Sequence, residues 1–238
     1  MIAIAVGGAR GRVSQLILQA IEADTDLSLA ASISRSDESP HLKAITTPID
    51  VFIDFTTPAA TLEYLAICQE RRYPMVIGTT GFSELEKVKI AHAAQIIPIV
   101  FSPNMSVGVN IMYKLLALAA NLLVGADRSN RPGVATDIAI VDIHHQHKKD
   151  APSGTALRMA EVIRNAALDS TINLSSVRLG DTIGEHSALF ALAGERIEIT
   201  HKATNRSLYA MGALQAAKWV VSQAPGLYDM QDVLGLRD

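Results

Sequence analysis

The start of the chain constrains the fold more than any other stretch, because a buried strand, a glycine turn and an amphipathic helix follow one another there. Ile2 to Val6 is an apolar run that ends in Gly7-Gly8. After Ala9-Arg10-Gly11-Arg12, apolar side chains recur at helical spacing from Val13 to Ile21. Such a glycine turn lets a pyrophosphate approach the helix N-terminus, and the order predicts an α/β fold of the Rossmann type.

Strands and helices continue to alternate up to about residue 105, which implies a right-handed, mostly parallel sheet. Further strands are expected at Leu27 to Ile33, Asp50 to Phe55, Met75 to Ile77 and Ile96 to Phe101. Helices are expected after Thr57 and after Ser83, each placed to act as an N-cap. Parallel strands end at one edge, and polar residues at two of these ends suit a ligand crevice. They are Gly78-Thr79-Thr80 and Ser102-Pro103-Asn104-Met105.

Beyond residue 105 the pattern changes, which predicts a second domain with helices and a mixed sheet. Its expected helices are Asn110 to about Val124 and, capped by Ser153, a helix to about Leu168. An apolar strand, Thr136 to Ile143, precedes a histidine cluster, and three further segments are predicted as an antiparallel sheet: Leu174 to Leu179, Ser187 to Ala193 and Arg196 to Ala203. A last helix starts at Thr204-Asn205-Arg206, and the tail from Gly226 could add a strand to a sheet.

Composition excludes several classes of protein. The formal net charge of -3 does not indicate a nucleic-acid surface, and no apolar run reaches the ~18 residues of a membrane span. The one cysteine, Cys68, lies in an apolar helical pattern and suggests a reducing compartment. Because the first residues lack the basic start of a signal sequence, we expect a cytoplasmic protein.

Ser34-Arg35-Ser36, after the second expected strand, bears on the choice of cofactor. NAD-binding units usually carry an acidic residue there, whereas an arginine flanked by hydroxyls would hold the 2′-phosphate of NADPH. Two plainer interpretations stay open: a solvated arginine on a loop, and a simple tight turn at Gly8-x-x-Gly11, since Ser14 stands where a third glycine would be.

Titratable side chains are most concentrated from His144 to Thr155, where three histidines and two lysines fall within six residues. One interpretation is a metal site, but His144 and His145 would point to opposite faces of a strand, and we expect no metal. A second is a solvated polar loop. The third is acid–base chemistry on an anionic substrate, with Ser153-Gly154-Thr155 at a helix start offering N–H groups to a carboxylate.

These motifs together resemble the 4-hydroxy-tetrahydrodipicolinate reductase family, the dihydrodipicolinate reductases of lysine and diaminopimelate biosynthesis. The signature stretch is His144-His-Gln-His-Lys148-Lys-Asp-Ala-Pro-Ser153-Gly-Thr155. The other matching motifs follow in order along nearly the whole chain: Gly8 to Val13, Val51 to Thr56, Val76 to Phe82, Asn104 to Asn110 and Gly194 to Ala203.

The resemblance implies reduction of a cyclic imine-type intermediate with NADPH, or more weakly with NADH. His144 would be the main proton donor or acceptor and Lys148 a second acid, while His145, Ser153, Gly154 and Thr155 would hold the carboxylates of the substrate. The implied cofactor-binding residues are Gly8, Ala9, Arg10, Gly11, Arg12, Val13, Gly78, Thr79, Thr80, Ser102, Pro103, Asn104 and Met105. The end of the second expected strand adds Ser34 and Arg35 to them.

The resemblance also implies a discontinuous dinucleotide-binding domain, 1–105 with 206–238, and a substrate-binding and oligomerisation domain, 106–205, in a homotetramer. Ser34 stands where many members have an acid, and Ala166 to Leu179 looks shorter than usual. Two alternatives remain: a non-catalytic dinucleotide-binding sensor, and another small-acid dehydrogenase on the same fold.

Overall fold

A computed structural model describes residues 1–34, 41–124, 136–167 and 171–237. The chain divides into two compact units, Met1–Val107 with Arg206–Asp238, and Gly108–Asn205. Each unit has its own sheet and its own apolar core. No described helix combines the length and the apolar character that crossing a membrane requires.

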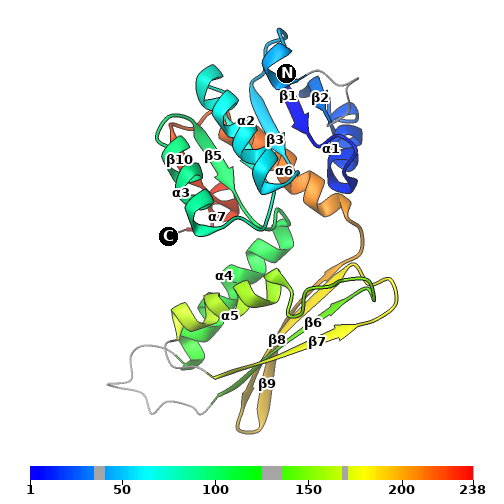
Figure 1. Cartoon of the computed structure of the whole chain (residues 1–238). Helices are drawn as coiled ribbons and strands as arrows, with labels where there is room; N and C mark the ends of the chain where they lie inside the picture. The colour runs from blue at the N-terminus through cyan, green and yellow to red at the C-terminus, as the bar shows by residue number, and fades with distance from the viewer. Residues whose placement is uncertain (35–40, 125–135, 168–170, 238) are drawn as a thin grey trace. The chain divides into compact units, whose positions relative to one another are not determined.

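The first unit is built on a six-stranded parallel sheet in the order β10-β5-β4-β3-β1-β2 (Figure 1). Its strands are β1 (Ile2–Gly7), β2 (Leu27–Ile33), β3 (Val51–Asp54), β4 (Met75–Ile77), β5 (Pro98–Phe101) and β10 (Gly226–Tyr228). The five strands expected from the sequence are present. The tail adds β10 beside β5, at one edge of the sheet.

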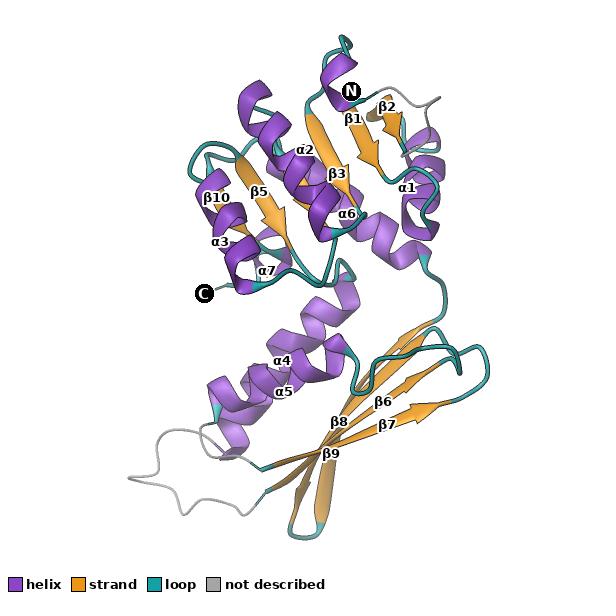
Figure 2. Cartoon of the chain, in the orientation of Figure 1, coloured by secondary structure: helices purple, strands orange, loops and turns teal. Residues whose placement is uncertain are grey.

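Helices cover both faces of this sheet (Figure 2). On one face pack α2 (Pro58–Arg71) and α3 (Glu84–Ala93), together with the short 3-10 helix η1 (Leu42–Ala44). On the other pack α1 (Arg12–Glu22), α6 (Ser207–Val220) and α7 (Met230–Val233). Apolar side chains therefore fill both sides of the strands, as a doubly wound sheet requires.

Two helix starts test the predicted caps. Ser83 caps α3 through a capping box, in which its hydroxyl accepts from the Glu86 N–H and Glu86 accepts from the Ser83 N–H. Thr57 is the N-cap residue of α2, but its side chain makes no capping bond, contrary to the prediction. Pro58 follows at the first position, where the missing N–H has no intrahelical partner to lose.

The second unit holds a four-stranded sheet in the order β7-β6-β8-β9. Its strands are β6 (Asp137–His144), β7 (Ile172–Arg178), β8 (Gly184–Leu192) and β9 (Glu195–Ala203), and its helices are α4 (Val107–Val124) and α5 (Gly154–Ala166). The sheet is mixed, as predicted, but the segment from Leu174 to Leu179 was expected to pair antiparallel, and β7 instead pairs in parallel with β6. The helix α5 lies between them in sequence, and such a crossover returns the chain in the same direction.

Alternation along β6 sets up the candidate site. Ile138 and Ile140 are buried in the core that α4 and α5 cover, and Asp142 and His144 continue the same face of the strand. Across the sheet His186 is paired with Asp142, and His201 with His186. A row of polar side chains thus extends the apolar core toward the end of β6.

Candidate active site

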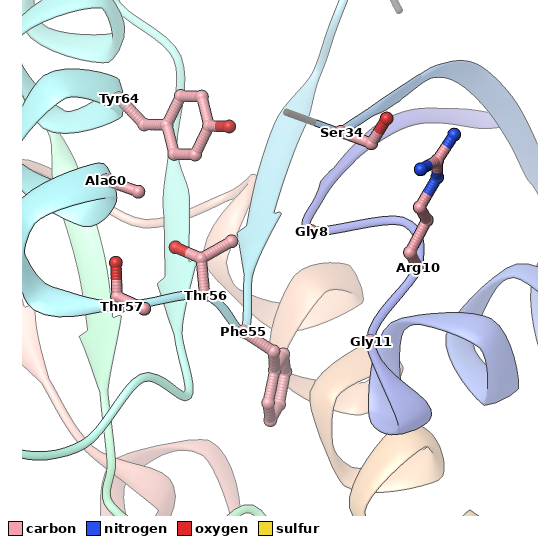
Figure 3. Close-up of a pocket in the computed structure, with 9 residues that line it drawn as sticks. All are labelled: Gly8, Arg10, Gly11, Ser34, Phe55, Thr56, Thr57, Ala60 and Tyr64. Atoms are coloured by element: carbon pink, nitrogen blue, oxygen red, sulfur yellow. The ribbon is translucent and has the colours of Figure 1, made fainter. Parts of the chain in front are cut away.

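A pocket of about 400 Å³ opens at the carboxyl edge of the first sheet. Its lining combines the turn after β1, the end of β2, the end of β3 and the start of α2 (Figure 3). The lining residues are Gly8, Arg10, Gly11, Ser34, Phe55, Thr56, Thr57, Ala60 and Tyr64. Four of these were expected to bind a cofactor; the other five follow the strand β3 and were not.

The glycines of the turn are required by their surroundings. Gly8 has φ of +70°, and a Cβ there would lie 2.7 Å from a methyl carbon of Thr56. A Cβ on Gly11 would lie 3.1 Å from the Gly8 carbonyl oxygen. Gly11 is also the N-cap of α1, whose first turn carries no acidic residue. This helix start therefore suits a phosphate, which α1 attracts through its N–H groups and dipole.

The end of β3 ties neighbouring strand ends together through Asp54, which is fully buried. Its carboxylate accepts from the hydroxyls of Thr56 (2.6 Å), Thr79 (3.0 Å) and Thr61. The Thr79 hydroxyl in turn accepts from the Thr56 N–H at 2.9 Å. Burial raises the pKa of Asp54, and the three hydroxyls oppose that shift. Thr79, a predicted cofactor residue, is thus joined to the edge of the pocket.

Several other residues that were predicted to bind the cofactor make contacts within the first unit. Gly78 packs against the Phe55 ring, since a Cβ there would lie 2.3 Å from it. Ser102 donates to the Asn104 carbonyl in the turn after β5. Met105 is 1% exposed and belongs to the core beneath α6, so its side chain packs in the interior. Arg35 lies outside the described residues.

In the second unit, the residues predicted to act on the substrate gather at the end of β6. His144 is buried, and its Nδ1 lies 3.1 Å from a carboxylate oxygen of the fully buried Asp142. Ser176 donates to the other oxygen at 2.5 Å, and the Arg178 guanidinium approaches the first at 3.3 Å. Both reach Asp142 from β7, where the parallel register places Ser176 beside Asp142 and Arg178 beside His144.

The charges around this pair set its protonation. Burial raises the pKa of Asp142, but the bond from Ser176 and the charge of Arg178 outweigh burial and hold the pKa below its ordinary value. Burial lowers the pKa of His144, the charge of Lys148 lowers it further, and Asp142 opposes both. Asp142 is therefore a carboxylate at neutral pH, facing a histidine that releases its proton readily.

Ser153 joins the same cluster from the start of α5. Its hydroxyl accepts from the Ala156 N–H at 3.2 Å, as predicted for a cap, and lies 3.1 Å from Nε2 of His186. The His186 ring meets the His144 ring edge-on, with centroids 5.0 Å apart. Nothing would crowd a Cβ on Gly154, so the first position of α5 is open to a ligand.

The other members of the histidine–lysine cluster are less buried. Lys148 forms an ion pair with Asp150 at 2.9 Å, and the rings of His145 and His147 lie 6.3 Å apart. The structure thus brings His144 and Ser153 into one buried network. Asp142, Arg178 and His186 complete that network and were missed. A sequence signal was available for Asp142 alone, because alternation along β6 places it on the same side as His144.

Comparison with known proteins decides the family. Residues 2–105 match the family model described as dihydrodipicolinate reductase, N-terminus, and residues 108–234 match that described as dihydrodipicolinate reductase, C-terminus. The chain belongs to the dihydrodipicolinate reductase family. Both units therefore have counterparts among dihydrodipicolinate reductases.

Curated relatives extend over the whole chain. A 4-hydroxy-tetrahydrodipicolinate reductase of Hahella chejuensis is 42% identical, with 100% of each chain covered. One from Nitrosomonas eutropha is 44% identical, with 98% of each covered. The first alignment is 276 positions long against the 238 residues of this chain, so that reductase carries residues that have no counterpart here.

A solved structure shares the fold. The dipicolinate-bound dihydrodipicolinate reductase from Paenisporosarcina sp. TG-14 superposes with a TM-score of 0.80 at 24% identity, with 98% of each chain covered. The parallel sheet with a second, mixed sheet is therefore an arrangement found in a dihydrodipicolinate reductase.

Proposed function

We propose that this protein reduces 4-hydroxy-tetrahydrodipicolinate to tetrahydrodipicolinate in lysine biosynthesis by way of diaminopimelate. The substrate loses water, and the resulting cyclic imine takes up a hydride and a proton. The observation that carries the proposal is the buried network of His144, Ser153 and Asp142 at the end of β6, in a member of this family.

The residues of the second unit have distinct tasks in this proposal. His144 delivers the proton from its imidazolium form, which burial and the charge of Lys148 make a stronger acid by lowering its pKa. Lys148 is a second proton source and a positive charge for the dicarboxylate. The open start of α5 at Gly154 and Thr155, with His145, binds a carboxylate through N–H groups.

The first unit binds the reduced nicotinamide cofactor, which supplies the hydride. Its pocket suits the phosphates and adenosine of a dinucleotide, because Gly8 and Gly11 of the β1–α1 turn line it and α1 starts at Gly11. We further propose that NADPH is preferred over NADH. Arg10 lines the pocket together with Ser34, and among the described lining residues none is acidic and would repel a 2′-phosphate.

We also propose a homotetramer assembled through the sheet of the second unit. Val141, Ile143 and Leu189 alternate with the core-facing residues and are only half-buried, so that face offers apolar area to a second copy. Sedimentation analysis tests this directly: a monomer at micromolar concentration would refute it.

The activity is tested by following NADPH oxidation while the preceding synthase supplies fresh substrate. We expect NADPH consumption that depends on the synthase product and stops without it. A dipicolinate-type analogue should inhibit competitively. A chain that binds NADPH yet ignores both the substrate and the analogue would instead be the dinucleotide-binding sensor, and the proposal would fail.

A further inference from the structure

We propose that Asp142 is a positioning residue for His144, that it keeps a proton on Nδ1 so that Nε2 serves the substrate, and that Arg178 links this carboxylate to the loop carrying Lys148. The inference rests on the proposed function and goes beyond it, because neither Asp142 nor Arg178 belongs to the proposed proton donors or substrate-binding residues.

The first step is to decide which residue, Asp142 or His144, carries the proton in the contact between them. Asp142 is fully buried and accepts hydrogen bonds from Ser176 and Arg178, which is the environment of an ionised carboxylate. An ionised carboxylate can only accept. The 3.1 Å contact with His144 is therefore an Nδ1–H donating to the carboxylate, and this assigns the tautomer.

The second step is the nitrogen that remains for chemistry. With Nδ1 committed to Asp142, only Nε2 of His144 can exchange a proton with a ligand. Gly184, at the start of β8, lies next to that atom, and a Cβ there would be 3.1 Å from Nε2. The lack of a side chain at Gly184 leaves this side of the ring uncrowded.

The third step concerns Arg178, which bonds both to Asp142 and to the loop that follows β6. Besides Asp142 it contacts the backbone of the loop after β6, donating from Nε to the Lys148 carbonyl at 3.3 Å and from Nη2 to the Asp150 carbonyl. Since Lys148 also pairs with Asp150, the loop that carries the second acid is fastened to the carboxylate that orients the first.

The charged and titratable neighbours of His144 determine the expected behaviour. Asp142 faces it from its own strand, Arg178 from β7 and His186 from β8, and Lys148 and Asp150 interact with it from the following loop. Asp142 favours the imidazolium, whereas Arg178 and Lys148 disfavour it. Removing Asp142 or Arg178 should therefore move the titration of His144 in opposite directions.

The test is NMR of the full-length protein with ¹⁵N-labelled histidine, recorded without substrate or cofactor. In the wild type we expect neutral His144 to carry its proton on Nδ1. Asp142→Asn, which keeps the shape and loses the charge, should lower the His144 pKa. Arg178→Met should raise it. Steady-state kinetics should show kcat reduced at least tenfold in both, with the KM for NADPH within twofold of wild type.

Ser176→Ala is the matched control, because it removes a bond to the other carboxylate oxygen and keeps the charge of Asp142. It should move the His144 pKa less than Asp142→Asn does. Arg178→Lys retains the positive charge and is the control in case Arg178→Met does not fold. It should leave the His144 pKa near the wild-type value.

A wild-type proton on Nε2, or a His144 pKa that Asp142→Asn leaves unchanged, would overturn the inference. These readouts use no substrate, so they stand apart from the proposed function. If the protein has the expected tautomer but fails the synthase-coupled assay, the proposed function is refuted and the inference about Asp142 and His144 stands.

Discussion

Gly184 lies directly beside the Nε2 atom of His144, so closely that a Cβ there would be 3.1 Å from it. A methyl group at this place must displace the imidazole by a few tenths of an ångström or cover its free nitrogen. We expect Gly184→Ala to lower kcat about 10- to 100-fold, because small misplacements of a catalytic group have such effects. Cofactor affinity, measured by fluorescence titration with NADPH, should not change; a variant with full activity would contradict the role of Nε2.

Replacing His144, the proposed acid, should lower kcat more than Gly184→Ala does. His144→Gln removes the titratable group and should lower kcat about 10²–10⁴-fold, the usual contribution of a positioned acid. Stopped-flow measurement of NADPH oxidation with the synthase product checks the chemical step. His147→Gln, in the same cluster but more exposed, is the control and should stay within about threefold of wild type. A His144 variant changed only in substrate affinity would argue for binding alone.

Cofactor choice can be tested at the residue that follows Ser34. Arg35→Ala should weaken NADPH binding about tenfold or more and leave NADH binding nearly unchanged, since only NADPH has the 2′-phosphate that a guanidinium holds. Calorimetric titration of both cofactors gives the comparison. Lys89→Ala removes the same charge from the exposed surface of α3 and should affect neither. Equal losses for both cofactors would refute the phosphate contact.

Packing of α6 on the first sheet gives a prediction about stability. A Cβ on Gly212 would lie 1.7 Å from the Met105 carbonyl oxygen, which no side-chain rotation relieves. Gly212→Ala should therefore reduce the free energy of unfolding by about 1–3 kcal/mol or more, as overpacking does. Urea denaturation measures it. The neighbouring Met211 is 59% exposed, and Met211→Ala should be close to neutral.

Stability should also fall in acid because of His186. Burial, with the charge of His144 second, lowers its pKa to about 3, against ~6.5 for an ordinary histidine. Between these values the unfolded chain binds the proton and the folded chain does not. The folded state therefore loses up to ~1.4 kcal/mol per pH unit as the pH falls from about 6.5 toward 3.

His186→Gln keeps a donor near the Ser153 hydroxyl and cannot titrate, so its unfolding free energy should depend less on pH over this window. Urea titrations at pH 6.5, 5.5 and 4.5 provide the slopes. His92→Gln, at an exposed site on α3, should keep the wild-type slope. Parallel slopes for wild type and His186→Gln would contradict the buried neutral histidine.

Much of the fold could be predicted because its local signals are strong. Apolar runs that end in glycine gave β1, and the Ser83 capping pattern gave the start of α3. The direction of β7 could not be read from its residues, since parallel pairing depends on the crossover through α5. Thr57 stands at the cap position, but its side chain makes no bond to the helix start.

The candidate site, too, could be predicted from the sequence only in part. Histidines, lysines and glycines cluster in sequence, so His144, Lys148 and the β1–α1 turn could be singled out. Asp142, Arg178 and His186 come from three strands that meet only through the register of the sheet. The row of Asp142, His186 and His201 is likewise a product of cross-strand pairing, which no local pattern reveals.

The discontinuity of the first unit has a consequence for biosynthesis. Its strands β1 to β5 are made first, and α2 and α3 can cover one face at once. A large share of the other face is covered by α6, which follows the whole second unit in the chain. At a synthesis rate of ~5–20 residues per second, α6 is completed on the order of 5–20 s after β5, and that face stays partly exposed in the interval. During synthesis the chain therefore exposes apolar surface that α6 covers in the finished protein.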